Sequence, residues 1–389
     1  MEPLNGIFIT HQIIKTTMKK LFFRLTMSVA VMALFTACDK DDKPVAGIQV
    51  YSEGAFVVNA GNMFSHIDGS LTAIDYKTNK ATQQVFKTAN GVSLGNTPND
   101  GLVYGGKIYI AVDKENTVEV LDKTTFKRIK QIKTTELLGA AEGKSPRHVV
   151  ADNGRVYVST FGGYVAAIDT ISFKLAAKYK VGNYPEGMLV VGNKLFVANS
   201  NYAKGGGNIS IIDFTNGTVT TKDVKGLNNP QSFYYGNDRQ LYVLDWATYD
   251  ANYKPLTENN LRRLKDGLST SEKVADANYV AVLKGIFVIV NAPYGQQASY
   301  TIFSPAENAK KDWALTDKVE FPCGVKIDPV RGNVFVMSNP KSKDGNFADY
   351  NADGYVYQYN TSGTKLAEYK TGVGPTAIFF NAGFRVVTE

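Results

Sequence analysis

The sequence predicts an all-β protein, a seven-bladed β-propeller whose ring is closed when the C-terminal strand completes the first blade. Three observations predict this fold. A short aromatic-centred run recurs seven times, two further strand patterns flank each run, and the first repeat lacks a strand that reappears at the C-terminus. A chain of 389 residues with 44% hydrophobic residues can bury a large core without disulfides.

The recurring run is predicted to be the second strand of each blade. Every copy alternates apolar residues, begins near Gly, Asn or Asp, and carries an aromatic residue at its third position. Neighbouring aromatic residues are 39 to 53 positions apart, a period typical of propeller blades and longer than helical repeats of about 33 or 34 residues. The runs are GAFVVNA, KIYIAVD, RVYVSTF, KLFVANS, QLYVLDW, GIFVIVN and NVFVMSN, with aromatic residues Phe56, Tyr109, Tyr157, Phe196, Tyr242, Phe287 and Phe335.

Further strands are predicted around each run. A segment that usually opens with Pro precedes it, as in TPNDGLVY, SPRHVVA, YPEGMLVV, NPQSFYY and FPCGVKI, with ADANYVAVL as a copy without Pro. A run that closes with Asp follows it, as in SLTAID, TVEVLD, YVAAID and NISIID, and then a more polar strand such as FKLAAKYKVG. We interpret the closing residues as turn formers rather than catalytic acids; they are Asp75, Asp122, Asp169 and Asp213.

The two ends of the repeat region predict how the ring closes. The first repeat begins at its second strand, Gly54 to Asn59, whereas Pro375 to Asn381 is a spare first strand. Pairing the two would remove free sheet edges. No G-H and W-D signature is present, which excludes a WD40 array. We expect helical turns only near residues 256–265 and 304–313.

The beginning of the chain predicts export. From Met18 it reads MKKLFFRLTMSVAVMALFTAC, with basic residues, an apolar run from Leu25 to Ala37, and then Cys38. The run of 13 residues is shorter than the roughly 20 that span a bilayer. It resembles a bacterial lipoprotein signal, in which the thiol of the Cys is acylated and this residue becomes the N-terminus. A non-lipidated secretory signal is the alternative.

These signals divide the chain into three parts. Residues 1–37 are an upstream extension plus signal peptide, residues 38–47 are a lipidated acidic tether, and residues 48–389 are the propeller. The tether begins with the charged run DKDDK at residues 39–43. This run resembles the acidic tag that directs Bacteroidetes lipoproteins to the outer face of the outer membrane.

Charge and cysteine content narrow the function classes. The formal net charge is +7, but 39 basic and 35 acidic residues lie beyond the predicted signal, and no Lys/Arg cluster accompanies them. We therefore exclude nucleic acid as a partner. Once Cys38 is lipidated, Cys323 is the only other cysteine, so no intrachain disulfide can form. Its apolar flanks indicate a small buried residue rather than a nucleophile.

Candidate ligand-binding residues lie where first strands begin and second strands end, because these junctions and the loops after the second strand ring one mouth of a propeller channel. The positions are rich in amides and aromatic side chains, so we expect a face poor in charge that suits a large, flat, hydrogen-bonding ligand. The loops at 246–260 and 340–353 are longer than hairpins need and are candidate binding loops. The ligand-binding candidates are Asn59, Phe64, Asn99, Arg147, His148, Phe161, Tyr164, Glu186, Asn199, Tyr202, Gln231, Trp246, Tyr249, Asn291, Tyr294 and Asn339, and the same mouth includes Asn62, Asp100, Asp113, Tyr253, Asn278, Phe347 and Tyr350.

One segment has the pattern of a calcium loop. Asp349, Asn351 and Asp353, followed by Gly354, reproduce the first half of an EF-hand-type loop, in which alternating oxygens converge on Ca²⁺. Asn360 stands where the bidentate Glu should be, and a strand pattern lies between. We therefore expect a turn without metal.

A catalytic interpretation has less support in the sequence. His148 beside Arg147, with Glu186 at the same junction one blade on, could form a lyase-like or lactonase-like pair. Beyond the signal, however, the only other histidine is His66, and no Ser-His-Asp or paired-carboxylate arrangement stands out by spacing. We expect a protein that is not an enzyme and uses no cofactor.

The strand patterns together carry a resemblance to a known family. The Pro-led first strand, the hydrophobic-aromatic-Val second strand and the third strand closing with Asp resemble those of YncE-like seven-bladed propellers, over residues 48–389. With the lipoprotein signal and the acidic tag, the chain is similar to the surface lipoproteins of Bacteroidetes that capture corrinoids such as vitamin B12. That resemblance implies a lipid-anchored protein at the outer membrane, exposed on the cell surface, that passes its ligand to a TonB-dependent transporter. A glycan- or protein-binding surface propeller is the alternative.

Overall fold

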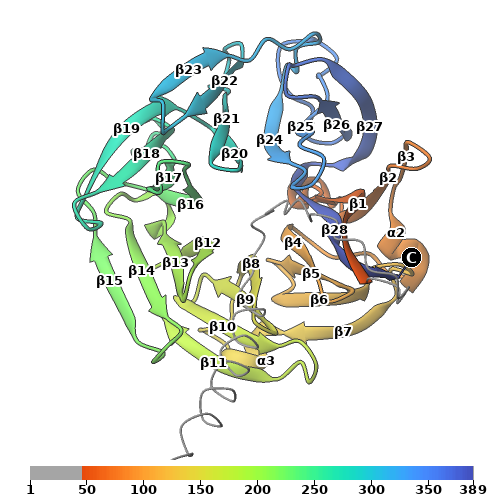
Figure 1. Cartoon of the computed structure of the whole chain (residues 1–389), viewed down its shortest axis with the longest axis horizontal. Helices are drawn as coiled ribbons and strands as arrows, with labels where there is room; N and C mark the ends of the chain where they lie inside the picture. The colour runs from red at the N-terminus through yellow and green to blue at the C-terminus, as the bar shows by residue number, and fades with distance from the viewer. Residues whose placement is uncertain (1–45, 389) are drawn as a thin grey trace, which may run out of the picture. The chain divides into compact units, whose positions relative to one another are not determined.

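Residues 46–388 are described by a computed structural model, in which seven four-stranded sheets form a ring (Figure 1). This confirms the predicted seven-bladed propeller. The predicted signal, Cys38 and the tether up to residue 45 lie outside the described residues. Within residues 46–388, no helix is long and apolar enough to cross a membrane.

Each blade orders its strands from the channel outward in the sequence pattern that the repeats predict. From the innermost to the outermost strand, the blades are: blade 1, β28 (Pro375–Thr388), β1 (Ala46–Asn59), β2 (Ser70–Asp75), β3 (Lys80–Thr82); blade 2, β4 (Pro98–Tyr104), β5 (Lys107–Val112), β6 (Thr117–Asp122), β7 (Arg128–Lys133); blade 3, β8 (Pro146–Asp152), β9 (Arg155–Thr160), β10 (Tyr164–Asp169), β11 (Leu175–Lys180); blade 4, β12 (Pro185–Val191), β13 (Lys194–Asn199), β14 (Asn208–Asp213), β15 (Val219–Asp223); blade 5, β16 (Pro230–Tyr235), β17 (Leu241–Asp245), β18 (Asn260–Lys265), β19 (Thr270–Asp276); blade 6, β20 (Tyr279–Leu283), β21 (Ile286–Asn291), β22 (Ser299–Ser304), β23 (Ala309–Asp312); blade 7, β24 (Pro322–Ile327), β25 (Val334–Ser338), β26 (Asp353–Tyr359), β27 (Lys365–Val373).

Ring closure is confirmed, because β28 is the hydrogen-bonded neighbour of β1. The proline that opens β28 also packs against the preceding blade. A Cβ on Gly354 would lie only 2.6 Å from Cδ of Pro375, so this contact requires glycine. Two other blade junctions use the same contact, between Gly69 and Pro98 and between Gly207 and Pro230.

A buried polar cluster adds a second connection between blades 7 and 1. The carboxylate of Asp328 accepts hydrogen bonds from Ser52 Oγ at 2.5 Å and from the Tyr76 hydroxyl at 3.1 Å. Arg331 Nε donates to the Ser52 carbonyl at 2.9 Å, and its guanidinium lies 4.5 Å from the centre of the Tyr76 ring. Burial and the neighbouring Asp328 charge raise the pKa of Tyr76 above its ordinary value.

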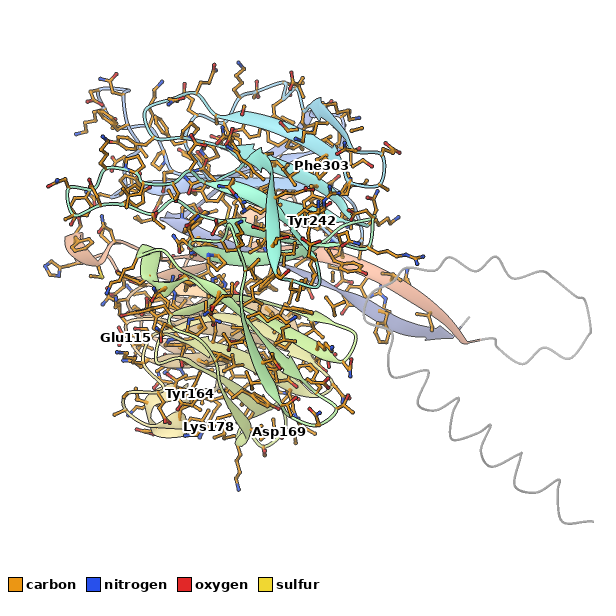
Figure 2. The ribbon with its side chains drawn as sticks, turned by 90° about the vertical axis from the view of Figure 1, so that its left-hand side faces the viewer. Glu115, Tyr164, Asp169, Lys178, Tyr242 and Phe303 are labelled. Atoms are coloured by element: carbon orange, nitrogen blue, oxygen red, sulfur yellow. The ribbon has the colours of Figure 1, made fainter. Side chains whose placement is uncertain are left out.

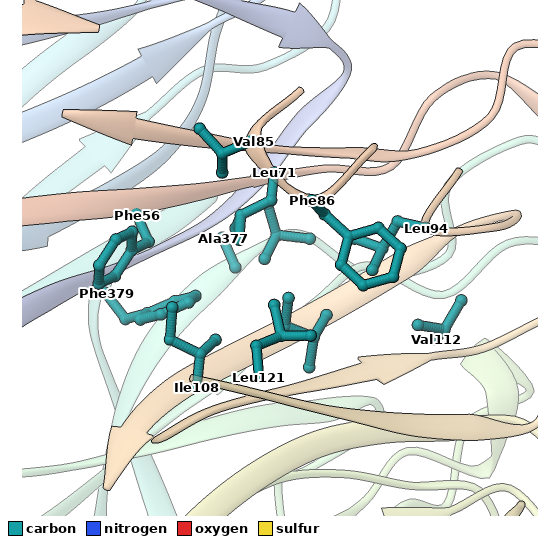
Figure 3. Packing of buried hydrophobic residues seen from close by; sticks show 12 residues of the cluster. Phe56, Leu71, Val85, Phe86, Leu94, Ile108, Val112, Leu121, Ala377 and Phe379 are labelled. Carbon is teal, nitrogen blue, oxygen red and sulfur yellow. The ribbon is translucent and has the colours of Figure 1, made fainter. Parts of the chain in front are cut away.

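The hydrophobic core is divided into seven clusters, each between two adjacent blades. Figure 3 shows the cluster between blades 1 and 2, where Phe56 and Phe379 of blade 1 face Ile108 and Leu121 of blade 2. The short helix α2 (Val85–Asn90) adds Phe86, which is fully buried. Adjacent blades are therefore held together by apolar packing as well as by ring closure.

One of the seven aromatic residues is out of register. Tyr109 of β5 pairs with Leu102, but Phe287 of β21 pairs one position nearer the hairpin, with Val282. A shift of one residue turns a strand's side chain to the other face of the sheet. Phe287 accordingly packs back against Tyr242 of blade 5, with ring centroids 4.8 Å apart.

The predicted turn-forming aspartates are confirmed. Asp122 Oδ1 accepts the backbone N–H groups of Thr125 at 2.8 Å and Thr124 at 3.0 Å. The hydrogen bond from Thr125 is the largest of the influences that lower the pKa of Asp122. Equivalent turns are made by Asp75, Asp169 and Asp213.

The expected helical turns are wrong in position. Residues 256–265 contain β18 and residues 304–313 contain β23, whereas the helical segments of residues 46–388 lie between strands elsewhere: η1 (Met63–Ser65), α2, α3 (Thr134–Leu138) and η2 (Asn201–Ala203). The two long loops are confirmed, because no named strand lies between β17 and β18 or between β25 and β26.

Candidate functional site

One end of the ring carries the starts of the innermost strands, the ends of the second strands and the loops between second and third strands. We call this end the mouth. In blade 2, for example, Pro98 pairs with Val112, which in turn pairs with Thr117. Figure 2 shows the ring from the side, with Glu115 marking the mouth loop of blade 2 and Asp169 a hairpin turn of blade 3.

The backbone changes course where the innermost strands begin at the mouth. In five blades a register shift follows the opening proline, and such bulges redirect side chains. The residues after these prolines are Asn99, Arg147, Glu186, Gln231 and Cys323.

A left-handed backbone conformation marks the same corner in the first four blades. The residue before the proline has a left-handed conformation in each, with φ between 51° and 64°, and a non-glycine residue rarely adopts it. No such residue precedes the opening prolines of blades 5 and 7. The four residues are Gly374, Thr97, Ser145 and Tyr184.

Blades 2 to 4 bring five charged or titratable side chains together, and we call them the charged row. Arg147 Nη1 lies 2.8 Å from Asp113 Oδ2, and its Nε lies 2.9 Å from Glu186 Oε2. His148 Nδ1 lies 3.1 Å from Asp100 Oδ2, and its Nε2 lies 3.7 Å from Glu186 Oε2. The expectation of a face poor in charge is therefore wrong for this part of the mouth.

Two members of the charged row, Asp100 and Arg147, are held in their ionised forms by their neighbours. Burial by itself would raise the pKa of Asp100, but the hydrogen bond and charge of His148, with Lys326 of blade 7, lower it below its ordinary value. Burial likewise opposes the charge of Arg147, but the carboxylates of Glu186 and Asp113 raise its pKa. Both carboxylates are almost completely buried, so the guanidinium is their essential partner.

Beside the charged row lie three aromatic rings, which we call the aromatic platform: Phe161, Tyr184 and Tyr202. Their ring centroids are 5.2 to 5.9 Å apart. The guanidinium of Arg147 lies 4.5 Å from the centre of the Phe161 ring, which connects the platform to the charged row. Tyr184 was missed by the sequence analysis, although its place directly before a strand-opening proline was a usable signal.

The long loop of blade 5 presents three more aromatic residues. Trp246 Nε1 donates to the carbonyl of Asn278 in the next blade at 3.0 Å, while Tyr249 and Tyr253 are exposed. Asp250 holds the loop in place by accepting the backbone N–H of Asn252 at 2.9 Å and that of Lys254 at 2.8 Å.

Blades 6, 7 and 1 meet at a cluster of aromatic and amide side chains. Tyr294, with 83% of its surface exposed, stacks on Phe347 of the long blade 7 loop at 5.9 Å and 18° between ring planes. Asn62 of blade 1 donates to Asn351 Oδ1 at 2.9 Å and to the Tyr350 carbonyl at 3.2 Å. Next to Asn62, Phe64 is also exposed.

Several predicted residues lie inside the blades rather than on the surface of the mouth. Asn59 and Asn199 are buried, and their amide groups donate to side chains of the neighbouring third strand. Gln231 is buried and donates to Asn229 Oδ1 at 2.6 Å. Four other predicted residues are partly buried: Asn99, Asn291, Asn339 and Tyr164. Asn99 donates to the Arg147 carbonyl. Lys178 lies over the ring of Tyr164 (Figure 2).

The oxygens of the calcium-like segment have separate partners. Asp349 accepts the N–H of Asn351, and Asp353 accepts from Gln83. Residues 46–388 contain no group of three or more His, Cys, Asp or Glu side chains placed to hold a metal ion. Burial raises the pKa of the Cys323 thiol to about 12, in agreement with its interpretation as a packing residue.

The chain is similar to known proteins in two respects, a family model and the fold of solved structures. A family model described as "Domain of unknown function (DUF5074)" matches residues 53–381. A search of curated proteins finds no match. Two solved structures provisionally named 6-phosphogluconolactonases have similar folds. The one from Bacteroides uniformis ATCC 8492 is 12% identical with a TM-score of 0.56, covering 85% of this chain and 100% of that one. The one from Bacteroides fragilis NCTC 9343 is 11% identical with a TM-score of 0.57, covering 85% and 98%.

Proposed function

We propose that this chain, which belongs to the DUF5074 family, is a binding propeller that holds a small molecule noncovalently at its mouth, with a corrinoid as the first candidate. One observation carries the proposal. Eight of the ten exposed aromatic side chains of residues 46–388 lie in mouth loops, and the exceptions are Tyr235 and Phe384. Exposed apolar groups gathered on one face of a rigid scaffold are typical of a binding surface.

The chemistry of the mouth favours a large ligand that carries hydrogen-bond donors. Aromatic rings supply contact area at low cost in conformational entropy, and they come from blades 1, 4, 5, 6 and 7, which surround the channel. The carboxylate of Asp100 offers an acceptor on the remaining side. A corrin ring bordered by amide groups matches both features.

A second candidate function comes from the charged row. His148 lies between the carboxylates of Asp100 and Glu186, an arrangement that can move a proton. The neighbours provisionally named lactonases lend this hypothesis a chemical class, hydrolysis of a sugar lactone. Binding is the better proposal, because the guanidinium of Arg147 is already paired with two carboxylates and is not free to stabilise a developing oxyanion.

Cellular location is the last part of the proposal. The lipoprotein-like signal and acidic tag support an anchor at Cys38, exposure on the outer membrane, and transfer of the ligand to a TonB-dependent transporter. Replacing Cys38 by Ser should release the protein from the membrane fraction. Continued retention in that fraction would contradict lipid anchoring.

The experiment that tests the function is calorimetric titration of the soluble form that starts after Cys38. Cyanocobalamin, a set of oligosaccharides and a sugar lactone are titrated separately. Tight, near-stoichiometric binding of cyanocobalamin is expected. Binding of an oligosaccharide alone would identify a glycan-binding propeller, and turnover of the lactone, lost in His148→Ala, would identify the enzyme.

A further inference from the structure

We propose that the aromatic platform is a subsite that stacks a flat heteroaromatic ring of the ligand. The inference rests on the proposed function only in placing a ligand at the mouth. It assigns to Phe161, Tyr184 and Tyr202 the chemical class of the group that they recognise.

The backbone of the platform is held in a strained form. Tyr184 has φ 51°, Asn201 φ 50° and Tyr202 φ 53°, the left-handed region that costs free energy for residues with a side chain. The hydroxyl of buried Ser200 joins the two tyrosines, because it donates to the Tyr184 carbonyl at 3.0 Å and accepts the Tyr202 N–H at 3.2 Å. Strain that the surrounding structure maintains is common at binding sites.

The rings leave one surface open. The ring plane of Phe161 makes an angle of 75° with that of Tyr184 and 86° with that of Tyr202, so neither tyrosine stacks on the face of Phe161. Tyr184 and Tyr202 are tilted by 35°. Tyr202 keeps 61% of its surface exposed, and another flat ring can extend this cluster by the same aromatic contacts.

The polar groups beside the platform favour a heteroaromatic ring over a sugar ring. A sugar ring needs acceptors and donors for its hydroxyl groups, but Arg147 is already paired with Asp113 and with Glu186. A heteroaromatic ring needs few such partners.

The test uses ligand-detected saturation-transfer NMR on the purified full-length chain, with benzimidazole at about pH 8, where this probe is uncharged. We expect saturation of the probe and none of methyl glucoside. In Tyr202→Asn the affinity for benzimidazole should fall about three- to tenfold, the size expected of lost aromatic contacts. Asn tolerates the left-handed backbone, so this variant removes the ring with little disturbance of the loop.

Two controls make the result specific. Tyr202→Phe should bind benzimidazole like the wild type, because it restores the ring. Tyr235→Ala removes an exposed tyrosine at the opposite end of blade 5 and should have no effect. Wild-type affinity in Tyr202→Asn, or binding of methyl glucoside in place of benzimidazole, would overturn the inference.

A parallel titration with cyanocobalamin separates this inference from the proposed function. Tyr202-dependent benzimidazole binding without cyanocobalamin binding would support the subsite and contradict the corrinoid proposal. Cyanocobalamin binding that is unchanged in Tyr202→Asn, with no benzimidazole signal, would contradict the subsite alone.

Discussion

The two sides of the mouth are built in different ways. Blades 2 to 4 carry the charged row and the aromatic platform, held by ion pairs between blades and by left-handed backbone corners. Blades 5 to 7 carry exposed rings, most of them on the two long loops between β17 and β18 and between β25 and β26. The comparison teaches that one side of the mouth is organised around buried charge, whereas the other presents mainly exposed aromatic contact area.

The largest expected difference between the two sides is in stability. Arg147→Met keeps an aliphatic stem over Phe161 but removes the guanidinium that the buried carboxylates of Asp113 and Glu186 share, so the free energy of unfolding should fall by about 3 kcal/mol. Tyr294→Ala on the other side should change it by less than about 0.5 kcal/mol. Urea denaturation measures both. Similar losses in the two variants would erase the distinction.

The second prediction concerns two variants of the residue that precedes a strand-opening proline. Gly374→Ala places a side chain at φ 64°, with Gly61 carbonyl oxygen 3.0 Å from the new Cβ, and should cost about 1–2 kcal/mol of stability. Ser145→Gly relieves the same conformation at φ 53° and should leave stability unchanged or slightly higher. Thermal unfolding measures the pair. If Ser145→Gly lost as much as Gly374→Ala, the corner would not be strained.

The third prediction concerns binding on the loop side. Replacing Trp246 and Tyr294 together by Ala should weaken cyanocobalamin binding at least tenfold, about 1.4 kcal/mol, because both rings are at the mouth. The melting temperature should stay near that of the wild type. Calorimetric titration and thermal melts measure the two quantities. Lost stability with unchanged affinity would show that these rings are packing residues.

The smallest expected effect is a pH dependence on the charged side. The lowered pKa of Asp100 means that its stabilising contribution is present above the pKa of the unfolded chain and is lost as the pH falls through the lower folded value. Asp100→Asn should therefore be less stable than the wild type at pH 7, and the gap should shrink toward pH 3. Denaturation midpoints across this range check the sign; a gap that widens in acid would reverse it.

The fold could be predicted because its signals are local. Each strand pattern and each turn-forming Asp lies within one short segment, and glycine–proline contacts repeat from blade to blade. Phe287 was placed in the wrong register because Lys284 and Gly285 form the hairpin turn, which moves the strand's start by one residue.

The site could be predicted only in part. The mouth residues were named, but the partners of Arg147 lie 34 and 39 positions away in other blades, so its ion pairs could not be inferred from spacing. Asn59 and Asn199 match the pattern of binding amides, yet they occupy buried positions between strands. Residue type indicates chemistry, whereas burial and pairing depend on how blades meet.

Ring closure also has a mechanical consequence. Strand β1 lies between β28 and β2 and is hydrogen-bonded to both, so a pull on its N-terminal end loads two ladders along their length. All hydrogen bonds of a ladder then resist together, whereas a strand at a sheet edge that is pulled sideways loses them one at a time. Blade 1 therefore resists a pull along β1 with two ladders, whereas a strand at a sheet edge has one.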